Sequence, residues 1–408
     1  MPNMPSQRLN PFAVTALFII PSGFLLYYIL FIYTIYIVSL IAFVASAVFF
    51  AIGRSLPFRA VVPSALLYGW WSLTALWSPN PEALYYVGVT GVFWLVGASA
   101  IVLKERFWED ATLWLIVLSS AACIISAFYS LYEVGTMIDE SKGSMRSTFG
   151  TFLAAGISGA LYFAITKRSI IAGLVFVASI FVGLQLGSRT FVLIAAPAVL
   201  ATIFILTRKS EFARLLRYPI ILSIALVLGV VANDMLADSG SDIAISGRQT
   251  SFSVDESIFS EARSPFEQGA DVERRLLIAV GLESFFDNPV VGAGFLSTPE
   301  YMLAVYGRAV VAHGFPFFIL GETGLIGLVI ILIVVRHSLR GYWLAIRQSH
   351  PKRSETAMIE MTTFLAILGI GMFQQVYQEF YLFIFLILGS YYNVQYGLNA
   401  GDRRASFR

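Results

Sequence analysis

Apolar runs of about 18 residues or more recur along this chain, separated by short polar or basic connections. A helix that crosses roughly 30 Å of bilayer hydrocarbon at 1.5 Å per residue needs a run of this length. The stretch 11–52 is long enough for two such helices. Further runs lie at 60–78, 83–103, 111–131, 149–166, 169–187, 190–207, 217–236, 315–335, 357–375 and 378–398. The pattern predicts an all-α, polytopic integral membrane protein with about 12 transmembrane helices.

Composition supports this prediction and excludes several functions. Of the 408 residues, 58% are hydrophobic and 13% are charged, and the mean hydropathy is +0.77, values that exclude a water-soluble globular protein. The formal net charge is only +2 and the basic residues are scattered, so we expect no nucleic-acid partner. Cys123 is the only cysteine, which excludes an intramolecular disulfide and a thiolate metal cluster.

The basic residues indicate how the helices are oriented, because loops rich in Lys and Arg remain in the cytoplasm. With the N-terminus inside, most of the 27 Lys and Arg residues fall on the cytoplasmic side. Both termini are then cytoplasmic, and we interpret the first apolar hairpin as an uncleaved anchor. The layout gives three parts: helices 1–9 over residues 1–236, a large outer loop over 237–312, and helices 10–12 with a cytoplasmic tail over 313–408.

The outer loop, residues 237–312, is the one long departure from this layout. Its first part, 239–264, is rich in serine and has little apolar periodicity. In the second part, apolar residues recur at helical spacing over 274–287, and Pro289, Gly292 and Gly294 follow as helix breakers. We expect an amphipathic helix on the membrane surface, followed by a turn back toward the helices.

One of the three histidines, His313, faces outward in this topology. It precedes a helix whose start is indicated by Pro316, so free amides and the positive end of a helix dipole would lie beside the imidazole. A histidine there could accept a proton next to an anion. An interfacial histidine that hydrogen-bonds a neighbouring loop would fit the same position.

Outward-facing arginines are the second group of candidates. Arg189 lies in a short outer connection, although basic residues are found mainly in cytoplasmic loops. Its guanidinium could bind phosphate oxygens through two parallel hydrogen bonds. Snorkelling to lipid headgroups is the alternative. Glu322, two turns into the helix after His313, could orient an arginine or a hydroxyl, or pair with a neighbouring helix. The remaining outward candidates are Arg146, Arg274, Arg275 and Arg308.

Three short motifs, in this order and on one side of the membrane, resemble the O-antigen polymerase and O-antigen ligase superfamily of bacterial envelope glycosyltransferases. They are Gly187–Thr190; Arg274 followed by Pro289 within Asn288–Phe295; and His313 followed by Gly321–Gly327. A weaker similarity lies in Met145–Phe152. The chain departs from the family pattern where Gly314 follows His313 in place of the common Asn, and where Ile278 stands nearest the usual Trp.

The resemblance implies a GT-C-like helical bundle in the bacterial inner membrane with a periplasmic active site. Its donor would be an undecaprenyl-diphosphate-linked oligosaccharide, and transfer would be inverting, without a metal or other cofactor. Carried over to this chain, Arg189, Arg274, Arg275 and Arg146 would bind the diphosphate, His313 would activate the acceptor hydroxyl, and Glu322 and Arg308 would support them. The implied partners are the donor, a glycan acceptor and membrane lipids, and the resemblance leaves room for a chain-length regulator.

The acceptor stays open between two reactions. A polymerase would join O-antigen, capsule or exopolysaccharide repeat units, whereas a ligase would transfer the glycan to lipid A core. A transporter or flippase of lipid-linked sugars is an alternative from another class, and a noncatalytic membrane scaffold is a third. A transporter predicts paired internal repeats and helices interrupted near the membrane midplane. The sequence has no convincing internal repeat, and its polar residues gather at the outer face.

Overall fold

The computed structural model describes residues 58–106, 109–134, 145–185, 189–207, 278, 280–306, 315–371 and 380–405. Within these ranges the chain forms α-helices, one short 3-10 helix and turns, and no strand, so the all-α prediction is confirmed. The helices expected within 11–52 and at 217–236 lie outside the described residues, as does the serine-rich part of the loop.

The helices begin and end close to the predicted apolar runs. They are α3 (Phe58–Thr74), the 3-10 helix η1 (Ala75–Trp77), α4 (Ala83–Arg106), α5 (Ala111–Val134), α6 (Met145–Thr166), α7 (Ile170–Gln185), α8 (Arg189–Thr207), α12 (Thr298–Tyr306), α13 (Phe315–Gln348), α14 (Pro351–Gly371) and α15 (Phe380–Ala405). The largest difference is in α13, which continues past its predicted end at residue 335. The apolar run stops there, but most of the residues that follow are good helix formers.

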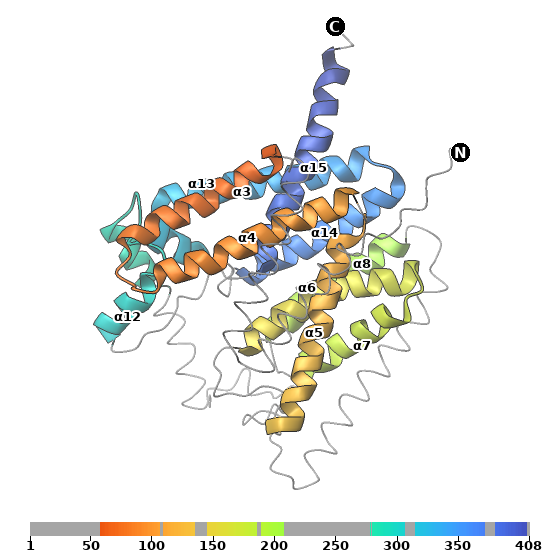
Figure 1. The fold of residues 1–408 in the computed structure, drawn as a ribbon, viewed down its shortest axis with the longest axis horizontal. Coiled ribbons are helices and arrows are strands. Elements are labelled where there is room, and N and C mark those ends of the chain that lie inside the picture. Colours follow the sequence, from red (N-terminus) through yellow and green to blue (C-terminus); the bar gives the residue numbers. More distant parts are fainter. Residues whose placement is uncertain are drawn as a thin grey trace, which may run out of the picture.

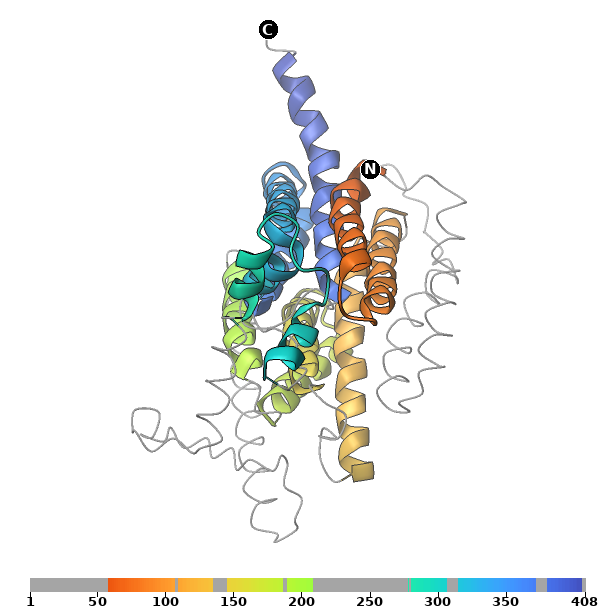
Figure 2. The same cartoon turned by 90° about the vertical axis from the view of Figure 1, so that its left-hand side faces the viewer.

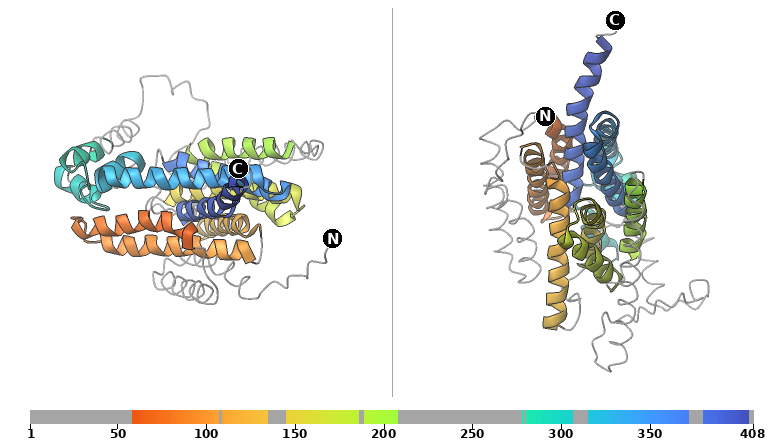
Figure 3. Two further views of the ribbon diagram at one scale, coloured as in Figure 1. Left: turned by 90° about the horizontal axis from the view of Figure 1, so that it is seen from above. Right: turned by 90° about the vertical axis from the view of Figure 1, so that its right-hand side faces the viewer.

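The helices form two groups that α14 joins. In the first, α3, α4 and α13 run side by side, and α15 packs against all three while crossing their direction (Figures 1 and 3). In the second, α6 packs against α5, α7 and α8, and α14 contacts both α6 and α8 as well as α13 and α15. The largest fully buried side chains include Trp71, Tyr342, Phe364, Phe383 and Tyr392.

Two of the described helices are long and apolar enough to cross a membrane, Ala111–Tyr129 and Pro316–Gln348. Three shorter apolar helices lie at Gly150–Thr166, Ile170–Gln185 and Ile194–Leu206. The helices in the described ranges therefore do not by themselves confirm the predicted count of about 12 spans.

Large apolar side chains are exposed in rows along single helix faces. On α13 the exposed fractions are 51% for Leu325, 46% for Val329, 58% for Leu332 and 60% for Ile333. On α3 and the 3-10 helix η1 that follows it, the exposed apolar side chains include Leu66, Leu73 and Leu76. Contiguous apolar surface of this kind is rare on a water-soluble monomer and is the surface that a helix presents to lipid.

Candidate functional site

α13 is interrupted at Gly324, whose φ of 66° and ψ of −168° are accessible only to glycine. Such an interruption leaves carbonyls before it and amides after it without partners in the same helix. A Cβ atom at this position would collide with the Val290 carbonyl. Glycine at 324 therefore permits both the break in the helix and the close approach of the segment that contains Val290.

The segment 289–294 provides partners for the carbonyls before the break. The amide of Ala293 donates to the carbonyl of Gly321, and the amide of Gly294 donates to the carbonyl of Glu322, each at 2.9 Å. Both accepting residues are buried, so without these bonds their carbonyls would remain unsatisfied away from water.

The same segment also provides partners for the amides after the break. The amide of Leu325 donates to the carbonyl of Pro289 at 2.9 Å, and the amide of Ile326 donates to the carbonyl of Val290 at 3.2 Å. Four backbone hydrogen bonds thus join the loop to both halves of α13. We call residues 288–298 and 321–326 together the Gly324 junction; its loop belongs to the teal part of the ribbon in Figure 2.

Two glycines make the loop's path through the junction possible. Gly292 has a φ of 75° and Gly294 a φ of 110°, both in the region that favours glycine. A Cβ atom on Gly292 would collide with the backbone of Glu322, and one on Gly294 would collide with the backbone of Ser78. The residues that the sequence indicated as helix breakers therefore allow close backbone packing as well.

Glu322 is fully buried at this junction. Its carboxylate accepts hydrogen bonds from the amide of Leu296, from the amide of Thr298 at 3.2 Å and from the Thr298 hydroxyl at 2.6 Å. Thr298 is the first residue of α12, where unpaired amides and the helix dipole favour a negative charge. Glu322 therefore fixes the start of α12 to the first half of α13, and the donors described here are all neutral.

The corner between α3 and α4 completes the junction, and no residue pattern predicted its role. The indole of Trp70 donates to the carbonyl of Thr323 at 3.1 Å, and that of Trp77 donates to the carbonyl of Gly292 at 3.3 Å. The amide side chain of Asn80 donates to the carbonyl of Leu296 at 3.0 Å. These partners are more than 200 residues away in the sequence, so no local pattern could identify them.

The helix expected over 274–287 is described from residue 280 onward, where the chain is helical to residue 287. Its buried side faces α13: the Ser284 hydroxyl donates to the carbonyl of Gly321 at 3.1 Å, and Gly281 lies against Phe317. Phe286 is 74% exposed on the other side. This helix therefore packs on α13 through small residues and leaves an aromatic side chain free to contact other molecules.

The structure brings together two of the three motif segments, Asn288–Phe295 and Gly321–Gly327, through the Gly324 junction. Arg146 and Arg189 lie in the first turns of α6 and α8, where the backbone alone is described. The other candidates, His313, Arg274, Arg275 and Arg308, lie outside the described residues, so their roles stay predictions.

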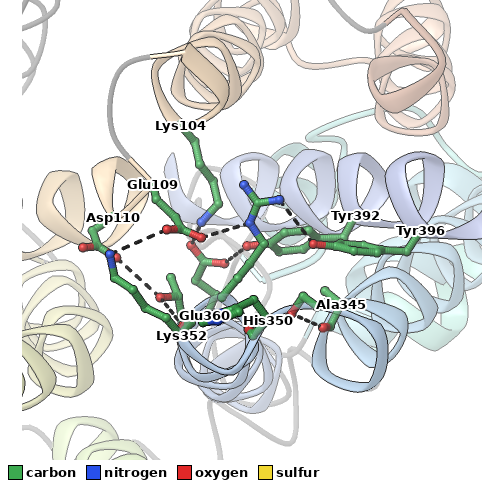
Figure 4. A network of polar contacts seen from close by, with 12 residues as sticks. Lys104, Glu109, Asp110, Ala345, His350, Lys352, Glu360, Tyr392 and Tyr396 are labelled. Carbon is green, nitrogen blue, oxygen red and sulfur yellow. Dashed lines mark hydrogen bonds and ion pairs between the residues drawn. The ribbon is translucent and has the colours of Figure 1, made fainter. Parts of the chain in front are cut away.

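A second polar cluster connects α4, α14 and α15 and was not singled out from the sequence (Figure 4). The Lys104 ammonium lies 2.6 Å from the Glu360 carboxylate, and both side chains are almost completely buried. The Tyr392 hydroxyl donates to the other oxygen of Glu360 at 2.8 Å. The ammonium also lies 5.4 Å from the centre of the Tyr392 ring. Glu360 is thus bound by a positive charge, unlike Glu322.

Further ion pairs extend this cluster toward solvent at the α4–α5 turn. Arg353 donates to Glu109 at 2.9 Å and to the Tyr396 hydroxyl at 3.3 Å (Figure 4). Burial lowers the pKa of the Arg353 guanidinium, but Tyr396 and Glu109 outweigh burial, so the pKa lies above its ordinary value. Asp110 accepts a salt bridge from Lys167 at 3.1 Å. We call the following residues the Glu360 cluster: Lys104, Glu109, Asp110, Lys167, Arg353, Glu360, Tyr392 and Tyr396.

Within the described residues, the contacts of the Gly324 junction hold the backbone in place and do not present reactive groups. The Glu322 carboxylate already accepts three hydrogen bonds, so it acts as an anchor for α12 and the preceding turn.

A scan against models of known protein families and a search of curated proteins both find no match to this chain.

Proposed function

We propose that this chain is a polytopic membrane glycosyltransferase that polymerises lipid-linked glycan repeat units on the periplasmic face of the bacterial inner membrane. The donor is an undecaprenyl-diphosphate-linked oligosaccharide, and transfer is inverting and independent of a metal. Ligation of the glycan to lipid A core uses the same donor and differs only in the acceptor. Supplying a repeat unit alone, and then lipid A core, to the purified protein distinguishes the two reactions.

The membrane placement is supported by charge boundaries on two neighbouring helices. Trp70 of α3 donates to the carbonyl of Thr323 of α13, and the two helices run side by side in opposite directions (Figure 1). Beyond Arg59, α3 and η1 contain no charged residue as far as Trp77, a stretch of about 27 Å that is close to the roughly 30 Å of bilayer hydrocarbon. From Pro316 to Arg336, α13 covers about 30 Å, and the only charged residue between these two is the buried Glu322.

The observation that carries the proposal is the Gly324 junction. It joins Asn288–Phe295 to Gly321–Gly327, two of the three segments in which the chain resembles the polymerase and ligase superfamily. Irregular backbone at membrane depth is stable only where protein or a water-filled cavity surrounds it. A chain that places its glycine-rich motifs in such a junction gains a rigid frame, which a transfer site requires.

The chemistry of this reaction suits the candidate residues. The departing lipid diphosphate gains negative charge in the transition state, and guanidinium groups such as Arg189 and Arg274 would stabilise that charge in a partly dry site. His313 would remove the proton from the acceptor hydroxyl, an effect typically worth about 10²- to 10⁴-fold in rate. Both steps use side chains alone, so the proposal needs no bound cation.

The break in α13 favours a transporter of lipid-linked sugars as the second candidate, because transporters bind substrates at interrupted helices. In such transporters the freed backbone groups coordinate the substrate or ion. In this chain the carbonyls of Gly321 and Glu322 and the amides of Leu325 and Ile326 are bonded to the loop. The break therefore serves to hold the loop, and we retain glycosyl transfer as the proposal.

Replacing the proposed base tests the function in cells. His313→Ala should abolish glycan extension while the protein's abundance in the membrane stays normal. The matched control is His350→Ala, which removes an exposed histidine just beyond the other end of α13 and should leave glycan length unchanged. Normal glycan lengths in the His313→Ala strain would refute the base role.

Replacing the proposed diphosphate ligand tests its geometry. Arg189→Lys should lose most activity, because an ammonium cannot form the two parallel hydrogen bonds of a guanidinium. Arg168→Lys, in the exposed turn between α6 and α7, is the control and should retain full activity. If Arg189→Lys is fully active, Arg189 contributes at most its charge.

A further inference from the structure

The exposed face of α13 changes from apolar to basic at one point. Leu325, Val329, Leu332 and Ile333 form the apolar part, and the basic part follows immediately. At 3.6 residues per turn, Arg336, Arg340, Trp343 and Arg347 fall within about 60° of one another around the helix axis. All four side chains are exposed, and they continue the same face that the apolar residues occupy.

The point at which the face of α13 changes from apolar to basic lies at nearly the same depth as a basic residue of the neighbouring helix α3. Starting from the bond between Trp70 and Thr323, Arg336 lies about 20 Å along α13 and Arg59 about 16 Å along α3 in the same direction. The basic residues of two antiparallel helices thus reach nearly the same level. A shared level is expected where hydrocarbon ends and headgroups begin.

The basic residues are directed toward the apolar part. Side chains on a helix lean toward its N-terminus, which on α13 is the direction of Ile333. The Arg347 guanidinium lies 4.3 Å from the centre of the Trp343 ring, a cation–π contact that brings it back toward Arg340. Trp343 is itself 49% exposed, as interfacial tryptophans are.

The positive charge of this face is not neutralised within the described ranges. There, no carboxylate forms a salt bridge with Arg336, Arg340 or Arg347, whereas Lys104, Lys167, Lys352 and Arg353 are all paired with acids. The only acidic residue of α13 is Glu322, at the far end of the helix. A partner for this face must therefore bring both negative charge and an apolar portion.

We propose that Arg336, Arg340, Trp343 and Arg347 bind the headgroup of an anionic phospholipid whose acyl chains lie along Leu325–Ile333. The phosphate pairs with the guanidinium groups of Arg336 and Arg340, and the Trp343 ring lies at the glycerol level. A phospholipid carries a negative headgroup and apolar acyl chains, in the same order as the basic and the apolar residues along α13. The proposal rests on the membrane placement proposed above and is independent of glycosyl transfer.

The test measures the thermal unfolding midpoint of the purified full chain in detergent micelles. Phosphatidylglycerol should raise the midpoint by about 2–4 °C relative to phosphatidylcholine of the same acyl chains, and added salt should reduce the shift. Arg336→Gln/Arg340→Gln should lose most of the shift. Arg336→Lys/Arg340→Lys should retain part of it, and Arg168→Gln, which removes an exposed arginine elsewhere, should retain all of it.

Three results would overturn the proposal: an unchanged shift in the double glutamine variant, an equal shift with inorganic phosphate, or an equal shift with an acidic peptide. The second would assign the face to a free anion and the third to a protein partner. If Arg336→Gln/Arg340→Gln does not fold, Arg336→Lys/Arg340→Lys and Trp343→Phe test the proposal in its place, since each should reduce the shift of the unfolding midpoint. No glycan donor is present in this measurement, so its failure leaves the transfer reaction untouched.

Discussion

Glu322 and Glu360 are both fully buried glutamates on neighbouring helices, yet they are bound in opposite ways. In the Gly324 junction, Glu322 accepts hydrogen bonds from two backbone amides and a threonine hydroxyl. In the Glu360 cluster, Glu360 is bound by the Lys104 ammonium and the Tyr392 hydroxyl. One carboxylate therefore fixes the path of the backbone, and the other balances a charge between helices.

This difference predicts how each region responds to substitution. A buried charge pair can be replaced as a unit, because removing both charges leaves no uncompensated charge in the interior. A carboxylate that holds backbone amides has no such replacement, since substitutions other than proline leave the backbone N–H groups in place. The Glu360 cluster should thus tolerate paired changes, whereas the Gly324 junction should not.

The largest effect is expected in the Glu360 cluster. Glu360→Ala leaves Lys104 charged and unpaired in the interior, which should lower the free energy of unfolding by about 3–5 kcal/mol. Lys104→Met/Glu360→Leu should recover most of that loss. Unfolding in micelles, followed by circular dichroism, measures both. A double variant as unstable as the single one would contradict the charge-pair interpretation.

Glu322→Ala should cost somewhat less, about 3 kcal/mol, because two buried amides and a hydroxyl lose their acceptor. In contrast to the Glu360 cluster, a second change at Thr298 should not rescue it, since the two amides remain. The same unfolding measurement applies. Recovery of stability in Glu322→Ala/Thr298→Val would show that the hydroxyl, and not the backbone, is the important partner.

Gly324→Ala tests the break in α13 and should cost about 2 kcal/mol from backbone strain, in addition to displacing Val290. Gly369→Ala is the matched control on α14, because its added methyl group would meet no atom within 4 Å. That control should leave stability unchanged or raise it by up to about 1 kcal/mol. Equal effects of the two substitutions would mean that the break is not required.

The smallest effect is expected for Thr298→Val, which removes the hydroxyl donor but keeps the two amides. The cost should be about 1 kcal/mol. Thr166→Val, at the last residue of α6, loses a comparable hydroxyl bond within one helix and serves as the control. If Thr298→Val matches Glu322→Ala, the amide bonds contribute little.

Within the described ranges the sequence predicted the helices well, because long apolar runs end at polar or helix-breaking residues. The predicted run at 190–207 is observed as α8 from Arg189 to Thr207, and that at 111–131 as α5 from Ala111 to Val134. The break at Gly324 was not predicted, since an isolated glycine in an apolar helix usually serves close packing. Its conformation depends on a loop that lies about 30 residues earlier in the chain.

The two polar regions were predictable to different degrees. The motifs of the Gly324 junction are recognisable as glycine-rich segments, and Glu322 stands out as a carboxylate within an apolar run. The Glu360 cluster was missed because Lys104 and Glu360 are 256 residues apart, and each resembles an ordinary residue near a helix end. Pairing across such separations is set by helix packing, which residue patterns do not encode directly.

Transfer itself is tested most directly by vesicles that contain the purified chain and an undecaprenyl-diphosphate-linked oligosaccharide. The account predicts longer glycans and released undecaprenyl diphosphate, in equal numbers to the new bonds, with or without a chelator. His313→Ala should abolish both products. Movement of intact donor across the bilayer without new glycosidic bonds would contradict the account and assign the chain to transport.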